Sequence, residues 1–495
     1  MALRRGFFRV RPSAVRLKVV GALVLTSLLA GCSGFSTRTD YREPVVSERD
    51  ALGNNLASKQ EAVNPATATV SLSELLDDSQ LADLISKSLQ ANPGLQQTLY
   101  TLKQARAQAR VTAASRLPDA DLGFSGQRTE ASDDRFTAEV SVSWELDLWS
   151  KLDDSHAAAL ADVAQQEALF QSARDSLVAS LIDAWLTLIH LNKSLQVQQQ
   201  RVEALEQNHQ STVQRYRTGI GSVDDLDSAR SSLASARSTL ADDQYQLAEA
   251  RRTLRGLVGV ATDGELQALG FSLADEFPTV AMPVAELPEQ TLERRPDLQA
   301  AWHGLEAAEF SRDVAYKDML PSLSLTAAYS DSATSPSEAL FQNPLWSLLG
   351  QLSAPLFRGG ELKANAQKAE YAVAEAAQSY RETLLTAVTE VENALDKERA
   401  LVQRMSAIDV ALGSARDNES RYVLRYRAGL ASLRDLLNVK QSRLDLEDSA
   451  HSLQYQHLSN RISLGLALGL PGVRSYLDSS TLNVADNSPV EETLK

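Results

Sequence analysis

The chain has 495 residues, and only 15 are proline, 23 glycine, 6 histidine and 1 cysteine. This composition favours long, uninterrupted elements over the layers of an ordinary enzyme of that length. The formal net charge of −15 argues against nucleic acid as a partner. It leaves two interpretations open, a preference for cationic solutes and a simply solvated surface.

The N-terminus has the pattern of a secretory signal peptide. Residues 1–31 carry six basic and no acidic side chains, and the apolar run Val19 to Ala30 is twelve residues long. A helix needs about 20 residues to span a bilayer, so this run is too short to do so. We therefore expect residues 1–31 to be removed as a signal peptide.

The only cysteine, Cys32, directly follows Leu29-Ala30-Gly31, a pattern that resembles the lipobox of bacterial lipoproteins. The resemblance implies that Cys32 becomes the acylated N-terminus, and that Ser33 directs the protein to the outer membrane. An ordinary signal peptide cut near position 30 is the alternative. With a single cysteine, no internal disulfide or paired-cysteine metal site is possible.

Two hairpins are expected, each after a helix that begins at Pro93 or Pro296 and is stopped by a Leu-Pro pair at 117–118 or 320–321. Residues 136–148 alternate between apolar and polar side chains without a fault, which predicts a strand. We expect its partner over residues 119–125, with a polar loop over 126–135. In the second half, strands are expected over 323–329 and 346–356.

A very long helix is expected after each hairpin. Residues 151–218 contain neither glycine nor proline, and residues 361–428 contain only Gly413. At about 1.5 Å per residue, each helix would be about 100 Å long. Shorter helices are expected over 222–255 and 430–464, after turns that contain glycine. One long helix would then lie beside two short helices stacked end to end.

The chain is a duplicated unit. Residues 215–226 match residues 425–436, and Tyr245 matches Tyr455, both at a spacing of 210. We divide the chain into residues 1–31, a signal peptide; 32–71, an extended segment; 72–280 and 281–470, two repeats; and 471–495, a flexible tail. The predicted fold is mainly α with a transmembrane β-barrel portion. Each repeat contains a helix, a β-hairpin, a very long helix and a further helix.

This duplicated unit, with its Arg-Tyr-Arg-x-Gly turns at 215–219 and 425–429, resembles the TolC-like outer-membrane efflux proteins. The lipobox is similar to that of the lipoprotein branch, which serves tripartite resistance-nodulation-division efflux systems. The resemblance implies a homotrimer with a twelve-stranded β-barrel, continued by a periplasmic α-helical barrel. It also implies a passive exit duct for drugs or other small solutes. The expected partners are a periplasmic adaptor, an inner-membrane transporter and outer-membrane lipid, without nucleic acid.

The resemblance also assigns roles to residues at the two turns. Adaptor contact is expected at the turns themselves, and a constriction of the tunnel just beyond them. The adaptor residues are Gly219, Ile220, Gly221, Gly429, Leu430 and Ala431; the constriction residues are Tyr426, Arg434, Asp435, Asn438, Asp224 and Asp225. Three copies of Asp435 would form an anionic ring, whereas solvated or paired helix charges remain the alternative. Asp224 and Asp225 are alternatively expected to form ion pairs between helices.

Three rival interpretations remain. A coiled-coil scaffold lipoprotein would need no barrel, so the alternating strand at 136–148 argues against it. An exit duct of a protein secretion system would share the same fold. An enzyme with a helical lid would need a catalytic motif, and the sequence contains neither Gly-x-Ser-x-Gly nor His-Glu-x-x-His. We therefore expect no enzymatic activity, no cofactor and no metal.

Overall fold

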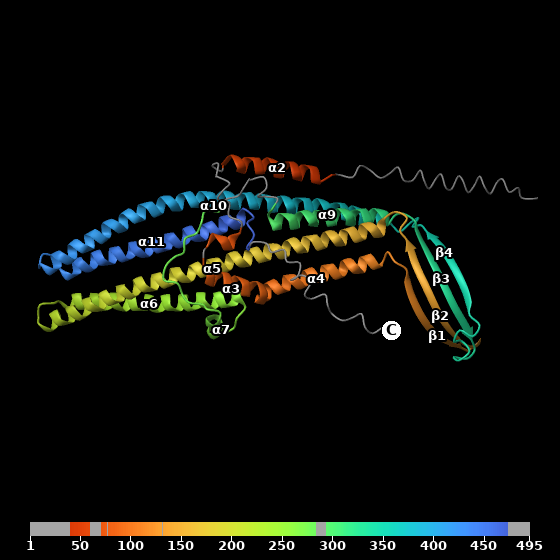
Figure 1. The fold of residues 1–495 in the computed structure, drawn as a ribbon, viewed down its shortest axis with the longest axis horizontal. Coiled ribbons are helices and arrows are strands. Elements are labelled where there is room, and N and C mark those ends of the chain that lie inside the picture. Colours follow the sequence, from red (N-terminus) through yellow and green to blue (C-terminus); the bar gives the residue numbers. More distant parts are fainter. Residues whose placement is uncertain (1–39, 60–70, 77, 131, 284–293, 474–495) are drawn as a thin grey trace, which may run out of the picture.

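The computed structural model describes residues 40–59, 71–76, 78–130, 132–283 and 294–473. The described chain is long and narrow, with the strands at one end and two helix turns at the other (Figure 1). The predictions for residues 1–31, Cys32 and residues 474–495 lie outside the described residues. None of the described helices combines the length and apolarity needed to cross a membrane.

The elements occur in the same order in the two halves of the chain, which confirms the duplicated unit. The first half contains α4 (Pro93–Ala114), β1 (Asp119–Thr129), β2 (Ser132–Leu146), α5 (Lys151–Arg217) and α6 (Val223–Val258). The second half contains α9 (Pro296–Lys317), β3 (Ser322–Ala333), β4 (Leu345–Ser353), α10 (Glu361–Arg427) and α11 (Leu433–Ala467). The remaining elements include α2 (Arg42–Lys59), η3 (Leu72–Leu75), α3 (Ser79–Ala91) and α7 (Asp263–Ala268).

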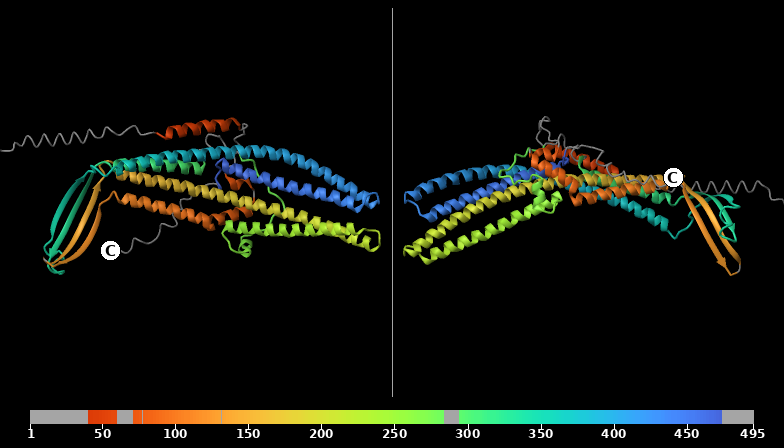
Figure 2. Two further views of the ribbon diagram at one scale, coloured as in Figure 1. Left: turned by 180° about the vertical axis from the view of Figure 1, so that it is seen from behind. Right: turned by 60° about the horizontal axis from the view of Figure 1, so that its bottom comes forward.

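The long helices α5 and α10 have 67 residues each, in agreement with the sequence pattern. Helix α5 begins where it does because the carboxylate of Asp147 accepts hydrogen bonds from the amides of Lys151 (2.6 Å) and Asp153 (2.9 Å). These amides have no partner within the helix, so a side-chain acceptor stabilises the helix start. Helices α4 and α6 pack on α5, and helices α9 and α11 pack on α10. Both helix turns lie at the same end of the molecule in the two views of Figure 2.

The strands form one antiparallel sheet in the order β1-β2-β3-β4. The expected loop over 126–135 was wrong, because Gly126 and Gln127 pair with Phe136 and Arg135 and the hairpin continues outward. Arg128 and Asp134 form an ion pair across this extension, so polar side chains extend the pairing beyond the apolar stretch. The expected strand over 346–356 was too long. Strand β4 ends at Ser353, just before Pro355, which has no amide hydrogen for the ladder.

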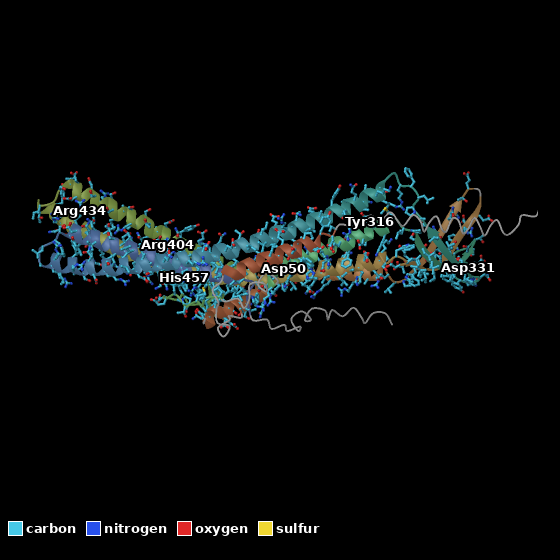
Figure 3. The ribbon with its side chains drawn as sticks, turned by 90° about the horizontal axis from the view of Figure 1, so that it is seen from above. Asp50, Tyr316, Asp331, Arg404, Arg434 and His457 are labelled. Carbon is cyan, nitrogen blue, oxygen red and sulfur yellow. The ribbon has the colours of Figure 1, made fainter. Side chains whose placement is uncertain are left out.

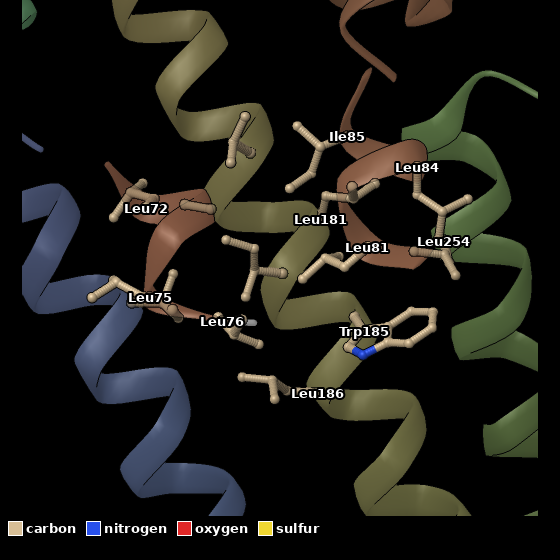
Figure 4. Packing of buried hydrophobic residues seen from close by; sticks show 14 of the residues in the cluster. Leu72, Leu75, Leu76, Leu81, Leu84, Ile85, Leu181, Trp185, Leu186 and Leu254 are labelled. Carbon is tan, nitrogen blue, oxygen red and sulfur yellow. The ribbon is translucent and has the colours of Figure 1, made fainter. Parts of the chain in front are cut away.

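A hydrophobic core holds the middle of the molecule together. Side chains from η3 and the residue after it, from α3, from α5 and from α6 meet there, and Figure 4 shows them at close range: Leu72, Leu75, Leu76, Leu81, Leu84, Ile85, Leu181, Trp185, Leu186 and Leu254. Trp185 is 1% exposed and meets the ring of Phe271 edge to face. Burial of such side chains stabilises each by about 1.5 to 3 kcal/mol. Leu458 and Ile462 of α11 belong to the same core, so it fixes the two halves relative to each other.

The short helices meet end to end at two equivalent joints. In the first joint, the side-chain amide of Asn92 donates a hydrogen bond of 3.0 Å to the carbonyl of Leu257. In the second joint, the guanidinium of Arg295 donates one of 3.1 Å to the carbonyl of Ala467, 210 positions after Leu257. Both side chains stand directly before the proline that begins the next helix, α4 or α9. The duplication therefore extends to the way in which helix ends are satisfied.

Helix α2 lies alongside α9 and α10 (Figure 1). Arg42 forms ion pairs with Glu306 (3.6 Å) and with Glu309, and its guanidinium lies 5.4 Å from the ring centre of Trp302. Arg381 of α10 pairs with Glu48 at 2.8 Å. The expectation of an extended segment over residues 32–71 was therefore wrong for Arg42–Lys59, which form a helix that these ion pairs fasten to the second half of the chain.

Candidate functional site

The two helix turns have the same backbone geometry. Gly219 and Gly429 have positive φ angles of 75° and 72°, which favour glycine because it has no Cβ. The amide of Ile220 donates to the carbonyl of Arg215 (3.0 Å), and the amide of Leu430 donates to that of Arg425 (2.8 Å). These bonds satisfy carbonyls at the ends of α5 and α10, in a Schellman motif. The repeated sequence therefore encodes a repeated turn.

The turns present aliphatic side chains to solvent. Ile220 is 74% exposed and Leu430 is 70% exposed, while Gly221 and Ala431 complete the two surfaces. Single exposed apolar side chains are common on protein surfaces, so it is their shared place at the turn end that makes these two candidates for contact with another protein. The six residues predicted to contact an adaptor thus lie together in two adjacent turns.

Asp435 is built into the start of α11. Its Oδ2 atom accepts hydrogen bonds from the amide (3.1 Å) and the hydroxyl (2.6 Å) of Ser432, and its amide donates to the Ser432 hydroxyl (3.2 Å). This is a capping box, which satisfies amides that the helix leaves without partners. The Ser432 hydroxyl bond, the Ser432 amide and the nearby Arg425 and Arg434 lower the pKa of Asp435 below its ordinary value of 3.8. The local structure therefore favours the charged form of the Asp435 carboxylate.

The other residues of the predicted constriction are also at this end of the molecule. Tyr426 is 41% exposed, and Arg434, Asn438 and Asp224 are exposed as well. Figure 3 shows Arg434 at the turn end and Asp331 at the sheet end. Asp225 accepts a hydrogen bond of 2.8 Å from the hydroxyl of Ser222, so its described bond is a local cap rather than the ion pair between helices considered from the sequence.

A seam of polar contacts between α5 and α11 was not predicted from the sequence. Tyr455 stands at its centre, because its hydroxyl accepts from Thr187 (3.1 Å), donates to Asp183 (3.4 Å), and its ring stacks on His190. Ser194 donates to Asp448 at 2.7 Å further along. The only sequence feature that pointed to Tyr455 was its match with Tyr245. Tyr245, however, is 57% exposed and takes part in no such seam. Equal spacing therefore did not imply an equal role.

A second network escaped notice because its members are far apart in sequence. Glu398 of α10 is 7% exposed. Its carboxylate contacts His457 (2.8 Å), Asn460 (3.2 Å) and Arg461 (3.0 Å) of α11. Arg461 also donates to the carbonyl of Val280 at 2.6 Å. Buried polar groups of this kind are stable only when each finds a partner, so the network fixes α10 against α11.

The histidines provide no metal site in the part of the chain that the structure describes. No group of three or more histidine, cysteine, aspartate or glutamate side chains there has the geometry to hold a metal ion. Burial lowers the pKa of His190 and of His451. These two histidines are therefore held as neutral side chains within the α5–α11 seam.

Comparisons with known proteins agree on one family. The model of the family described as outer membrane efflux protein matches residues 84–260 and 287–470. The Escherichia coli protein named cation efflux system protein CusC is 28% identical over 400 residues, which cover 79% of this chain and 86% of that one. The Salmonella typhimurium protein named probable outer membrane lipoprotein SilC is 26% identical over 455 residues, which cover 89% of this chain and 96% of that one.

The fold is also similar to solved structures. The crystal structure of a membrane protein from Pseudomonas aeruginosa superposes with a TM-score of 0.74 at 26% sequence identity. The superposition covers 83% of this chain and 99% of that chain.

Proposed function

The chain belongs to the outer membrane efflux protein family, and from this premise we propose that three copies form one passive exit duct for drugs or other small solutes. The protein is an outer-membrane channel subunit of a tripartite efflux system. Such a system joins the outer-membrane component to a periplasmic adaptor and an inner-membrane transporter. The transporter supplies the energy, and we assign no catalytic step to this chain.

The four-stranded sheet is the observation that carries the proposal. Among the described residues of one chain, β1 and β4 each pair along one edge only, because the strand order is β1-β2-β3-β4. The strands have 9 to 15 residues, and about 9 to 11 residues are needed to span an outer membrane. Transmembrane barrels have at least about 8 strands, so one chain is too small to close. Three chains would supply twelve strands, with β4 of one chain beside β1 of the next.

The proposed orientation follows from both ends of the molecule. The acyl chains on Cys32 would hold the N-terminus at the inner leaflet of the outer membrane, and the sheet would cross that membrane. Helix α2 is fastened to α9 and α10, near the sheet end of the helical portion. The turns at Ile220 and Leu430 would then lie deepest in the periplasm, where an adaptor can reach them.

We further propose that the turn end is the narrow end of the duct. Asp435 is an exposed carboxylate whose hydrogen bonds with Ser432 favour its charged form. Three such carboxylates around a threefold axis would repel one another and attract cations. In this arrangement Tyr426, Arg434 and Asn438 line the same opening, and Arg434 partly offsets the acidic charge.

Single-channel conductance of the purified, lipidated protein in a planar bilayer tests the proposal. We expect a small, cation-selective conductance. The absence of conductance from protein shown to be folded and inserted would instead favour the scaffold lipoprotein. The secretion-duct alternative is tested separately by deleting the gene: accumulation of a secreted protein in the periplasm, with drug tolerance unchanged, would support that alternative.

A further inference from the structure

A cavity of about 960 Å³ lies between α5 and α10, at the joint where α11 ends and α9 begins. We call it the wall cavity. Residues of α5, α6, α10 and α11 and the first residues of α9 line it. A shallower hollow of about 460 Å³ along α10 shares Glu390 and Asn393 with the lining of the wall cavity.

The wall cavity exists because a single side chain spans the joint without filling the space around it. Arg295 is 7% exposed and reaches across the joint to the carbonyl of Ala467. On the facing side of the cavity, α5 carries serine at positions 172, 176 and 180, each one helical turn from the next. These side chains are too small to occupy the space between the long helices.

The lining combines an apolar wall with an excess of carboxylates. Leu257, Ile462, Leu466 and Leu470 form the apolar part. Four carboxylates, those of Asp175, Asp183, Asp297 and Glu390, face two basic side chains, Arg295 and Lys397. Arg295 is already paired with Asp297 (2.7 Å) and Glu390 (2.8 Å). Among the described lining residues, Lys397 is then the remaining basic side chain for Asp175 and Asp183, and Arg174 outside the lining also attracts Asp175.

Both of these aspartates have an oxygen without a donor. Asp175 is 4% exposed, and it accepts from the amide of Gly472 (2.7 Å) and from Gln171 (2.8 Å), both at Oδ1. Asp183 accepts from Ser459 (2.5 Å) and Tyr455 (3.4 Å), again both at Oδ1. Among the described residues, no hydrogen bond reaches Oδ2 of either side chain. Oδ2 of Asp183 is not among the enclosed oxygens that lack a partner, so it is accessible and can form a charge-assisted hydrogen bond with a cation.

We propose that the wall cavity binds an amphiphilic organic cation, whose charged group pairs with Oδ2 of Asp183 and whose apolar body packs against Leu257 and Leu466. Asp183 is the reachable partner because it is only half-buried, whereas Asp175 is almost fully enclosed. Ligand sites of about 300 to 1,000 Å³ hold drug-sized molecules in mainly apolar walls with a few polar anchors. The inference rests on the proposed function, since such a solute would reach the cavity as cargo.

The test uses the full-length protein in lipid nanodiscs, titrated with tetraphenylphosphonium in a calorimeter. Triphenylphosphine oxide serves as the uncharged probe. We expect Asp183→Asn to weaken tetraphenylphosphonium binding at least about tenfold and to leave the binding of the uncharged probe unchanged. The control is Asp409→Asn, which removes an exposed carboxylate of α10 outside the cavity and should change neither affinity. Ser180→Trp should weaken both probes by filling the cavity.

Three outcomes would overturn the inference: no saturable binding to the native protein, equal affinity of the native protein and Asp183→Asn, or an equal loss in Asp409→Asn. If Asp183→Asn fails to assemble, Ser180→Trp decides, because unchanged binding to that variant also places the probe elsewhere. Conductance of the same preparation separates this inference from the proposed function. A protein that conducts but does not bind the probe contradicts only the wall cavity, whereas a folded protein that does not conduct contradicts the duct itself.

Discussion

The carboxylate of Asp435 accepts hydrogen bonds from both the amide (3.1 Å) and the hydroxyl (2.6 Å) of Ser432. The same side chain that would form an anionic ring in a trimer therefore also begins α11. Asp435→Ala would therefore change two properties at once, the charge at the turn end and the cap of a helix. Variants that separate the two properties are needed.

We predict that Asp435→Asn raises single-channel conductance, because asparagine removes the charge but keeps an oxygen that can accept from Ser432. Asp435→Ala removes both the charge and the cap, so it should raise conductance at least as much. The control is Asp409→Asn, which removes an exposed carboxylate of α10 away from the turns and should leave conductance unchanged. If Asp435→Ala opens the channel and Asp435→Asn does not, the helix cap rather than the anionic ring keeps the end narrow.

We predict that cation selectivity persists to unusually low pH. Within one chain the bonds with Ser432 lower the pKa of Asp435 from 3.8, and we expect this effect to outweigh the repulsion between the three carboxylates of the ring, so that the charge persists until the pH falls below that ordinary value. The cap's contribution to stability is likewise complete above pH 3.8 and is lost as the pH falls through the lower folded pKa. Reversal potentials across a potassium chloride gradient, measured from pH 7 to pH 3, would report the change. Selectivity that is lost near pH 5 would contradict this assignment.

We predict that Arg295→Met lowers the free energy of unfolding by about 1 to 3 kcal/mol. The variant leaves the carbonyl of Ala467 without its donor and separates Asp297 and Glu390 from their shared partner. Arg399→Met is the control, because the Arg399 pair with Asp396 is largely exposed and contributes little. Heat denaturation of the assembled protein, followed by circular dichroism, measures both. Equal melting temperatures for the two variants would contradict a stabilising role of Arg295.

We predict that Ile220→Ala together with Leu430→Ala weakens adaptor binding about tenfold or more, because both side chains are exposed at the turns. Surface plasmon resonance with the purified adaptor provides the affinity. Val410→Ala is the control, since Val410 is 71% exposed on α10 but lies away from the turns. Conductance of the isolated protein should not change. A similar loss of affinity in the control would place the contact surface elsewhere.

We predict that Cys32→Ser abolishes incorporation of labelled palmitate. The experiment is unambiguous because the chain has no other cysteine that could accept a thioester-linked or thioether-linked lipid. The variant should also lose its tight association with membranes before the barrel has formed, which pulse-labelling and fractionation would follow. Unchanged labelling would contradict Cys32 as the lipidated residue.

The long helices were predictable because their signal is local. The absence of glycine and proline between Lys151 and Arg217 is enough to define α5, and the repeated turn at Gly429 shows where α10 must end. The capping box of Ser432 and Asp435 was equally recognisable in the sequence, since serine followed three residues later by an acid predicts a helix start. The family resemblance drew attention to the charge of Asp435 instead.

The joint and the wall cavity could not be predicted, because their partners are remote in sequence. Arg295 reaches Ala467 across 172 positions, and Asp183 reaches Ser459 across 276. No periodicity relates these residues. The hairpin lengths failed for a different reason, since backbone pairing beyond Gly126 continues through polar side chains that carry no strand pattern.

The two unpaired edges of the sheet have a consequence for the life of a newly made chain. A single copy that reaches the periplasm carries β1 and β4 as open strands with exposed leucine, phenylalanine and tryptophan side chains. Such edges pair readily with any strand that they meet. The solitary chain is therefore prone to aggregation, and we expect it to mature only where sister chains are available to pair with its two open strands.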